Sequence, residues 1–129
     1  MPVLTASPTL GDLLKFELNA SYTRETVTLK AGTSYPLGSV LGRITASGGY
    51  RLSPAAEVVG DEGAETAVAV LLDAVDATDG AATGLIAARG PVILADAALV
   101  FDASVDQPAE RTAKIVQLAA MGLVARVTV

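Results

Sequence analysis

Cysteine, histidine and tryptophan are all absent from the 129 residues of this sequence. Without cysteine the chain has no disulfide, no iron–sulfur cluster, no zinc–thiolate site and no thiol nucleophile. Without histidine it lacks the general base of a Ser-His-Asp triad and the commonest ligand of transition metals. Aromatic residues make up only 4% of the chain, which disfavours the aromatic platforms of sugar-binding sites. We therefore expect no catalytic residue, no metal ion and no cofactor.

Charged residues are scarce, and their balance is acidic. Nine basic residues against 14 acidic ones give a formal net charge of -5, which is unfavourable for binding to DNA, RNA or anionic membranes. Charged residues make up 18% of the chain and apolar residues 51%, where about 25% charged residues is usual. A small domain of this kind often covers part of its surface by associating with other chains. We expect protein partners, and neither nucleic acid, a membrane nor a small-molecule substrate.

Long apolar segments are absent too. The longest uninterrupted apolar run, residues 67–72, is much shorter than the roughly 20 residues that a membrane-spanning helix needs. The first apolar residues follow no basic segment, so no signal peptide is expected. A chain of this length is expected to form one domain whose core is large enough to fold without disulfides or metals.

The N-terminal 20 residues differ in composition from the rest. Residues 1–20 are rich in threonine, serine and proline, and Pro2 and Pro8 disfavour a helix there. We expect an extended N-terminal arm over residues 1–20, followed by a β-rich domain over residues 21–129.

Within this arm, residues 11–18 have a pattern of their own. Leu14, Phe16 and Leu18 alternate with charged residues, which is typical of a half-buried strand. Two interpretations are open: the segment is the first strand of the domain, or it pairs with a partner protein.

Short aliphatic and β-branched segments separated by turn residues predict strands in the rest of the chain. They lie at residues 24–30, at 40–45 and 51–52 as a hairpin, and at 67–72, 84–89, 91–94, 97–101 and 123–129. The segment 67–72 is apolar throughout, which indicates a strand covered on both faces.

One helix is predicted, over residues 108–121, with Asp106 as its N-cap and Gly122 as its stop signal. Its residues divide into one face with Thr112, Ile115, Ala119 and Gly122, and another with Glu110, Lys114 and Gln117. The sum is an α+β, mainly β fold: a compact single domain of short strands and hairpins with one C-terminal helix, preceded by an extended N-terminal arm.

An acidic cluster is the most suggestive feature for metal binding. Asp73, Asp76 and Asp79 precede Gly80, and hard cations need several oxygen ligands. The spacing differs from that of an EF-hand loop. We interpret the cluster as a solvated turn with local Asx hydrogen bonds.

A second acidic group and the serines are the remaining candidates for catalytic or binding residues. Asp61, Glu62 and Glu65 are interpreted as a charged loop. Serines such as Ser39 and Ser53 have no histidine partner and stand outside any G-x-S-x-G motif. A Ser-Lys pair is the one nucleophile–base arrangement left, and the chain is not expected to be an enzyme.

Five segments of the sequence are together specific to one protein family when they occur in this order. Each of them alone is ordinary core or turn sequence. They are GDLLK (residues 11–15), LGSVLGRI (37–44), AVLLDAVDA (69–77), ARGPV (88–92) and QLAAMGLV (117–124). In this order they resemble the bacteriophage head decoration proteins, the family of the lambda head protein D. One departure is Phe101-Asp102, where relatives often carry Trp and then Pro.

The resemblance implies a structural protein of the virion, made in the bacterial host cytoplasm and located on the outer surface of the capsid. It implies a homotrimer at three-fold and quasi-three-fold positions that locks neighbouring major capsid subunits together after the shell expands. It also implies an arm that orders against the capsid and adds β pairing there, which places the contact on residues 1–18. The candidate anchors are Leu10, Leu13, Leu14, Phe16 and Leu18.

Two alternatives stay open. A phage tail or baseplate subunit would share the β-rich, cysteine-free character, and it would bind tail proteins instead of the head. A small cytosolic ligand-binding domain would be a monomer with an apolar pocket.

Overall fold

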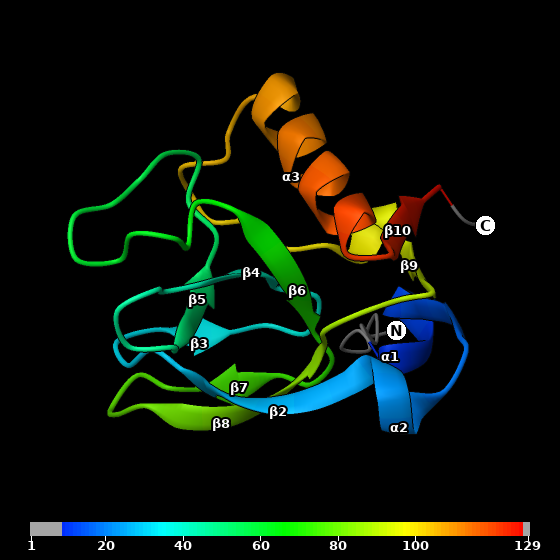
Figure 1. The fold of residues 1–129 in the computed structure, drawn as a ribbon, viewed down its shortest axis with the longest axis horizontal. Coiled ribbons are helices and arrows are strands. Elements are labelled where there is room, and N and C mark those ends of the chain that lie inside the picture. Colours follow the sequence, from blue (N-terminus) through cyan, green and yellow to red (C-terminus); the bar gives the residue numbers. More distant parts are fainter. Residues whose placement is uncertain (1–8, 128–129) are drawn as a thin grey trace, which may run out of the picture.

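The computed structural model describes residues 9–127. Within these residues the chain forms ten strands in three sheets, with one long helix near the C-terminus (Figure 1). The elements are α1 (Leu10–Leu13), β1 (Leu14–Glu17), α2 (Ala20–Thr23), β2 (Arg24–Leu29), β3 (Ser34–Tyr35), β4 (Val40–Arg43), β5 (Tyr50–Leu52), β6 (Ala67–Leu71), β7 (Val75–Asp76), β8 (Ala82–Ala87), β9 (Val92–Ala95), a 3₁₀ turn (Asp96–Ala98), α3 (Pro108–Ala120) and β10 (Leu123–Arg126). The mainly β, α+β fold expected from the sequence is confirmed.

Five strands close into a barrel in the order β2-β5-β4-β6-β8. Cross-strand pairs such as Leu41 with Ala69 and Leu71 with Ile86 place apolar side chains on one face of the wall. This face encloses one of the two hydrophobic clusters of buried residues. The segment 67–72 forms β6, and both of its faces are covered as predicted, because Val70 belongs to the second cluster.

The second cluster lies between the barrel, α3 and a three-stranded sheet of order β1-β9-β10. β9 is central, antiparallel to β1 and parallel to β10, and the crossover between β9 and β10 contains α3, as parallel strands require. Figure 1 shows α3 over β6 and β10, and both strands contact it. β1 lies within the segment expected to form the arm, and in the structure it is a strand of this sheet.

The predicted strand at residues 97–101 is wrong. The chain forms the short 3₁₀ turn there, closed by a hydrogen bond from Leu99 N to Asp96 O at 3.2 Å. Only Val100 then pairs, in an isolated bridge with Ser39. Arg111 of α3 holds the Asp96 carbonyl oxygen at 2.9 Å, and this contact fixes the turn in place of an extended segment.

The helix prediction is confirmed in its bounds, and the structure shows which side chains face the core. α3 ends before Gly122, whose φ of 82° lies in the left-handed region, and Gln107 replaces Asp106 as the N-cap. Lys114 and Leu118 point into the core, whereas Thr112 and Ala119 are exposed. Lysine occupies a core position because its ammonium group finds oxygen partners there. Within residues 9–127 no helix is long and apolar enough to cross a membrane.

Candidate functional site

The five predicted anchor residues divide into an inward and an outward set. Leu13 is fully buried in the core, and Leu10 and Leu14 pack against the same cluster. Phe16 and Leu18 are exposed, at 47% and 64%. The division arises because the pairing register shifts between Leu14 and Phe16, and such a bulge re-aims the following side chains. Residues 1–8 of the expected arm lie outside the described residues.

Phe16 begins an apolar row that crosses the whole β1-β9-β10 sheet. It pairs with Ile93 of β9, which pairs with Val124 of β10, so the three side chains project from the same face. Val124 is 41% exposed, and Leu18 continues the row where its N–H donates to Pro91 O at 3.3 Å. We call Phe16, Leu18, Ile93 and Val124 the outer apolar row.

Sequence reasoning missed two members of the outer apolar row, Ile93 and Val124. The available signal was alternation: Val124 stands between Leu123 and Ala125, which face the core. An apolar residue at the outward position of a half-buried strand has no role in the core. A cluster of such residues marks a surface suited to contact with another protein.

The same sheet has an open edge at β10. Val92 N donates to Gly122 O at 3.1 Å, and backbone groups alternate in direction along a strand. The N–H and C=O groups of Leu123 and Ala125 therefore point away from β9, and no strand within residues 9–127 pairs with them. An unpaired edge beside exposed apolar side chains can accept an extended segment of another chain.

An ion pair fixes the strand that carries Phe16. Arg24 donates to Glu17 through Nε, at 2.9 Å, and through Nη2, at 2.8 Å, and the Thr23 hydroxyl donates to the same carboxylate. These bonds, the one from Arg24 first, hold the pKa of Glu17 below its ordinary value. The bidentate geometry attaches β1 to the start of β2 and so limits the movement of the outer apolar row.

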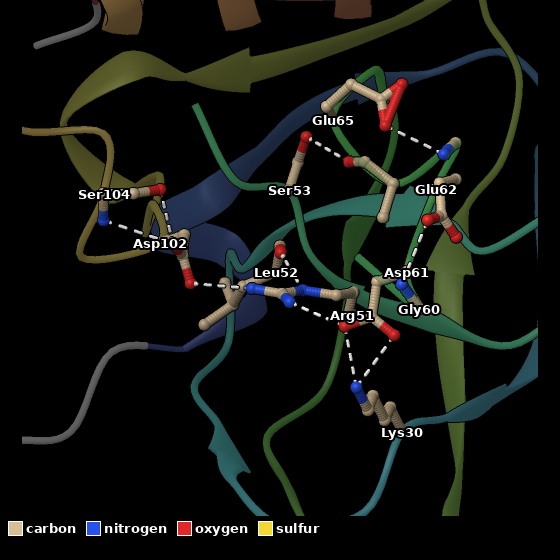
Figure 2. Close-up of polar contacts among 12 residues, drawn as sticks. Lys30, Arg51, Leu52, Ser53, Gly60, Asp61, Glu62, Glu65, Asp102 and Ser104 are labelled. Carbon is tan, nitrogen blue, oxygen red and sulfur yellow. Dashed lines mark hydrogen bonds and ion pairs between the residues drawn. The ribbon is translucent and has the colours of Figure 1, made fainter. Parts of the chain in front are cut away.

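A charged cluster lies where the β5–β6 connection meets β5 and the end of β2. Figure 2 shows Asp61 between Lys30 and Arg51, with Asp102 on the other side of the Arg51 guanidinium. The distances from Asp61 Oδ2 are 2.7 Å to Lys30 Nζ and 2.8 Å to Arg51 Nη1, and Arg51 Nη2 lies 3.4 Å from Asp102 Oδ1. The hydrogen bonds, from Lys30 first and then from Arg51, lower the pKa of Asp61. Asp61 therefore remains a carboxylate at neutral pH and ties the β5–β6 connection to β2 and β5.

Asp61 lies on the charged loop expected from the sequence, but it is buried there, with a residue exposure of only 5%. Glu62 does lie on the surface, where it accepts a hydrogen bond from Gly60 N at 3.1 Å. Asp76 forms the predicted Asx turn by accepting from Thr78 N at 3.0 Å, and the Thr78 bonds lower its pKa, that from the side chain first. Within residues 9–127 no group of three acidic side chains is arranged to hold a metal ion.

Within residues 9–127 the structure brings together one Ser-Lys pair, Ser53 and Lys114. Lys114 Nζ donates to Ser53 Oγ at 2.9 Å, to Pro54 O at 2.6 Å and to Glu65 O. Ser53 Oγ in turn donates to Ala64 O at 2.7 Å. Burial lowers the pKa of Lys114. The three oxygen acceptors around Nζ nevertheless favour its ammonium form, which can donate to all of them. Both residues are at most 2% exposed, so the pair holds α3 against the two ends of the β5–β6 connection and has no access to a substrate.

Comparison with known proteins identifies the family. The sequence model of a family described as bacteriophage lambda head decoration protein D matches residues 3–123. No curated protein matches the chain significantly. The matched region contains the barrel, the β3-β7 pair, β1, β9 and α3, and it ends at the first residue of β10. Because the match covers most of the 129 residues, the chain belongs to the family of the bacteriophage lambda head decoration protein D.

Proposed function

We propose that this phage head decoration protein binds the outside of the expanded head as a homotrimer and stabilises the shell. Each trimer occupies a three-fold or quasi-three-fold position and links neighbouring major capsid subunits. The protein is made in the host cytoplasm and carries out no catalysis. Family membership supports the capsid role, in preference to a tail subunit or a cytosolic ligand-binding domain.

The observation that supports the proposed contact with the capsid is the outer apolar row beside the open edge of β10. Phe16 and Leu18 are exposed on the segment that leads from the N-terminus, where the family resemblance places the capsid contact. A capsid segment that adds to the β10 edge would satisfy the free backbone groups and cover the apolar side chains. The remaining predicted anchors, Leu10, Leu13 and Leu14, support this surface from the core side.

In a trimer, three individually weak contacts with the capsid are sufficient for stable binding. Three copies of the same surface on one rigid body act at high effective concentration, so the second and third contacts form more readily than the first. A protein that binds only the expanded shell stabilises that shell by mass action. Stabilisation then requires no chemical change in either partner.

Co-sedimentation with expanded heads that lack the decoration protein tests the proposal. Removing residues 1–18 would also remove Leu13 from the core, so point substitutions give the cleaner result. Phe16→Ser with Leu18→Ser should weaken binding by about tenfold or more, because each exposed apolar side chain contributes about 1 kcal/mol or more when buried. Val116→Ser on α3, whose side chain is 63% exposed, is the matched control and should bind like the natural protein. Full-length protein that stays in the supernatant, or a double variant that binds normally, would refute the proposal.

A further inference from the structure

The barrel is closed by a single residue pair between β2 and β5. The two strands are parallel and meet only at Leu29 and Tyr50, beside a hydrogen bond from Lys30 N to Tyr50 O at 2.8 Å. The half of β2 that precedes Leu29 has no partner strand on this side. A hollow of about 290 Å³ lies next to it, with Val68, Ile86 and Ala88 among its lining residues. We call this hollow the seam pocket.

The seam pocket carries an excess of positive charge. Arg43 lines it, and within residues 9–127 the Arg43 guanidinium forms no ion pair. Arg89, which also lines it, is paired with Glu25 at 2.6 Å. The pocket thus has one net positive charge in a chain whose net charge is -5. An apolar hollow with one free cation fits an apolar segment that carries one acidic side chain.

The chain itself presents such a segment on the connection between β5 and β6, which projects away from the barrel in Figure 1. Val59 stands at the tip of a turn closed by a hydrogen bond from Asp61 N to Val58 O at 2.9 Å, with Gly60 at a φ of 94°. Val59 is 95% exposed and Val58 is 37% exposed. Glu57 is exposed and forms no ion pair in the described part of the chain. We call residues 57–59 the docking turn.

Hydrogen bonds hold the docking turn in position before any partner arrives. Asp61 at its base is fixed by Lys30 and Arg51, and Ala55 N donates to Ser104 Oγ at 2.9 Å. An exposed valine on a mobile loop would lose conformational freedom on binding, whereas a fixed turn loses little. The turn therefore presents its apolar tip as a preformed knob.

A ring of three identical chains needs two different, complementary surfaces on every copy. From these observations, and resting on the proposed trimer, we propose that the docking turn of one copy enters the seam pocket of the next. Val59 and Val58 cover the apolar floor of the pocket, and Glu57 pairs with Arg43. Repeating the contact three times closes the ring and leaves the outer apolar row to the capsid.

Cross-linking tests the contact directly, because the chain has no cysteine of its own. Val59→Cys is combined with Met121→Cys, since Met121 lines the seam pocket and is 40% exposed. Mild oxidation of the double variant should give covalent trimers on a non-reducing gel, and each single variant should not. Products limited to dimers linked through position 59 of both copies, or no products from a protein that sediments as a trimer, would overturn the inference.

A charge exchange provides an independent test by sedimentation equilibrium. Arg43→Glu and Glu57→Arg should each weaken trimer association by about tenfold, and the double variant should recover most of that loss. Arg126→Glu is the matched control, because Arg126 is exposed and also forms no ion pair within residues 9–127. Circular dichroism confirms that each variant is folded. Single variants that associate normally would contradict the contact.

Binding to heads separates this inference from the proposed function. If the Val59→Cys, Met121→Cys variant forms covalent trimers but the natural protein does not bind expanded heads, the capsid role is refuted and the contact is supported. A protein that binds heads but whose double variant gives no disulfide between positions 59 and 121, either free or on the heads, would refute the contact and leave the capsid role standing.

Discussion

At the scale of single residues, buried charges determine which parts of the surface are rigid. Asp61 receives hydrogen bonds from Lys30 and Arg51, and Lys114 donates to three oxygen atoms of the β5–β6 connection. Each group joins segments far apart in the sequence. The docking turn and the face that α3 covers are held by these polar contacts as well as by the hydrophobic clusters.

Asp61 makes the stability of the protein depend on pH. Its pKa is lower in the folded state than the ordinary value of 3.8, so the unfolded state binds more protons as the pH falls below about 4. Its stabilising contribution is therefore complete above that range and is lost as the pH falls through the folded pKa. Asp61→Asn should reduce the free energy of unfolding by about 2–4 kcal/mol at pH 7, and the difference should shrink towards pH 2.

Urea denaturation at a series of pH values measures this effect. Asp79→Asn is the matched control, because Asp79 is exposed and forms no ion pair within residues 9–127. An Asp61→Asn variant whose loss of stability is the same at pH 7 and pH 2 would show that the carboxylate charge does not stabilise the fold.

At the scale of elements, β4 approaches the loop before β6 so closely that only glycine fits at position 42. A Cβ atom on Gly42 would stand 1.9 Å from the backbone oxygen of Ala64, and Ala64 is itself fixed by Ser53 Oγ. Gly42→Ala should lower the free energy of unfolding by about 2–3 kcal/mol, measured by urea denaturation. Gly80→Ala meets nothing within 4 Å and should change stability by less than about 0.5 kcal/mol. Equal stabilities for the two variants would contradict the close approach.

The elements show where sequence reasoning succeeds and where it ends. β2, β4, β5, β6, β8, β9 and α3 were predictable because alternation, continuous apolar runs and helix stop signals are local properties. The partners of Asp61 stand 31 and 10 residues away, and Ser53 stands 61 residues from Lys114. No local pattern encodes such contacts, so the inward position of Lys114 and the burial of Asp61 were missed. For the same reason the sequence could not divide the candidate anchors into Leu13 inside and Phe16 outside.

At the scale of the whole molecule, the two candidate contact surfaces belong to different parts of the fold. The outer apolar row lies on the β1-β9-β10 sheet, and the docking turn connects two strands of the barrel. A subunit can therefore bind the capsid through its sheet and its neighbours through its barrel at the same time. In the proposed assembly each contact would reinforce the other, since a closed trimer would present three sheets to the shell together.

This arrangement predicts how shell stability responds to the amount of protein. If the trimer binds only intact expanded shells, each tenfold rise in its free concentration above the dissociation constant should add about 1.4 kcal/mol of stabilisation per site. Calorimetry of expanded heads should then show a melting temperature that rises steadily with the logarithm of that concentration. The Phe16→Ser, Leu18→Ser variant should need about tenfold or more protein for the same shift. A melting temperature that is independent of added protein, or identical for the variant, would mean that the outer apolar row does not hold the shell together.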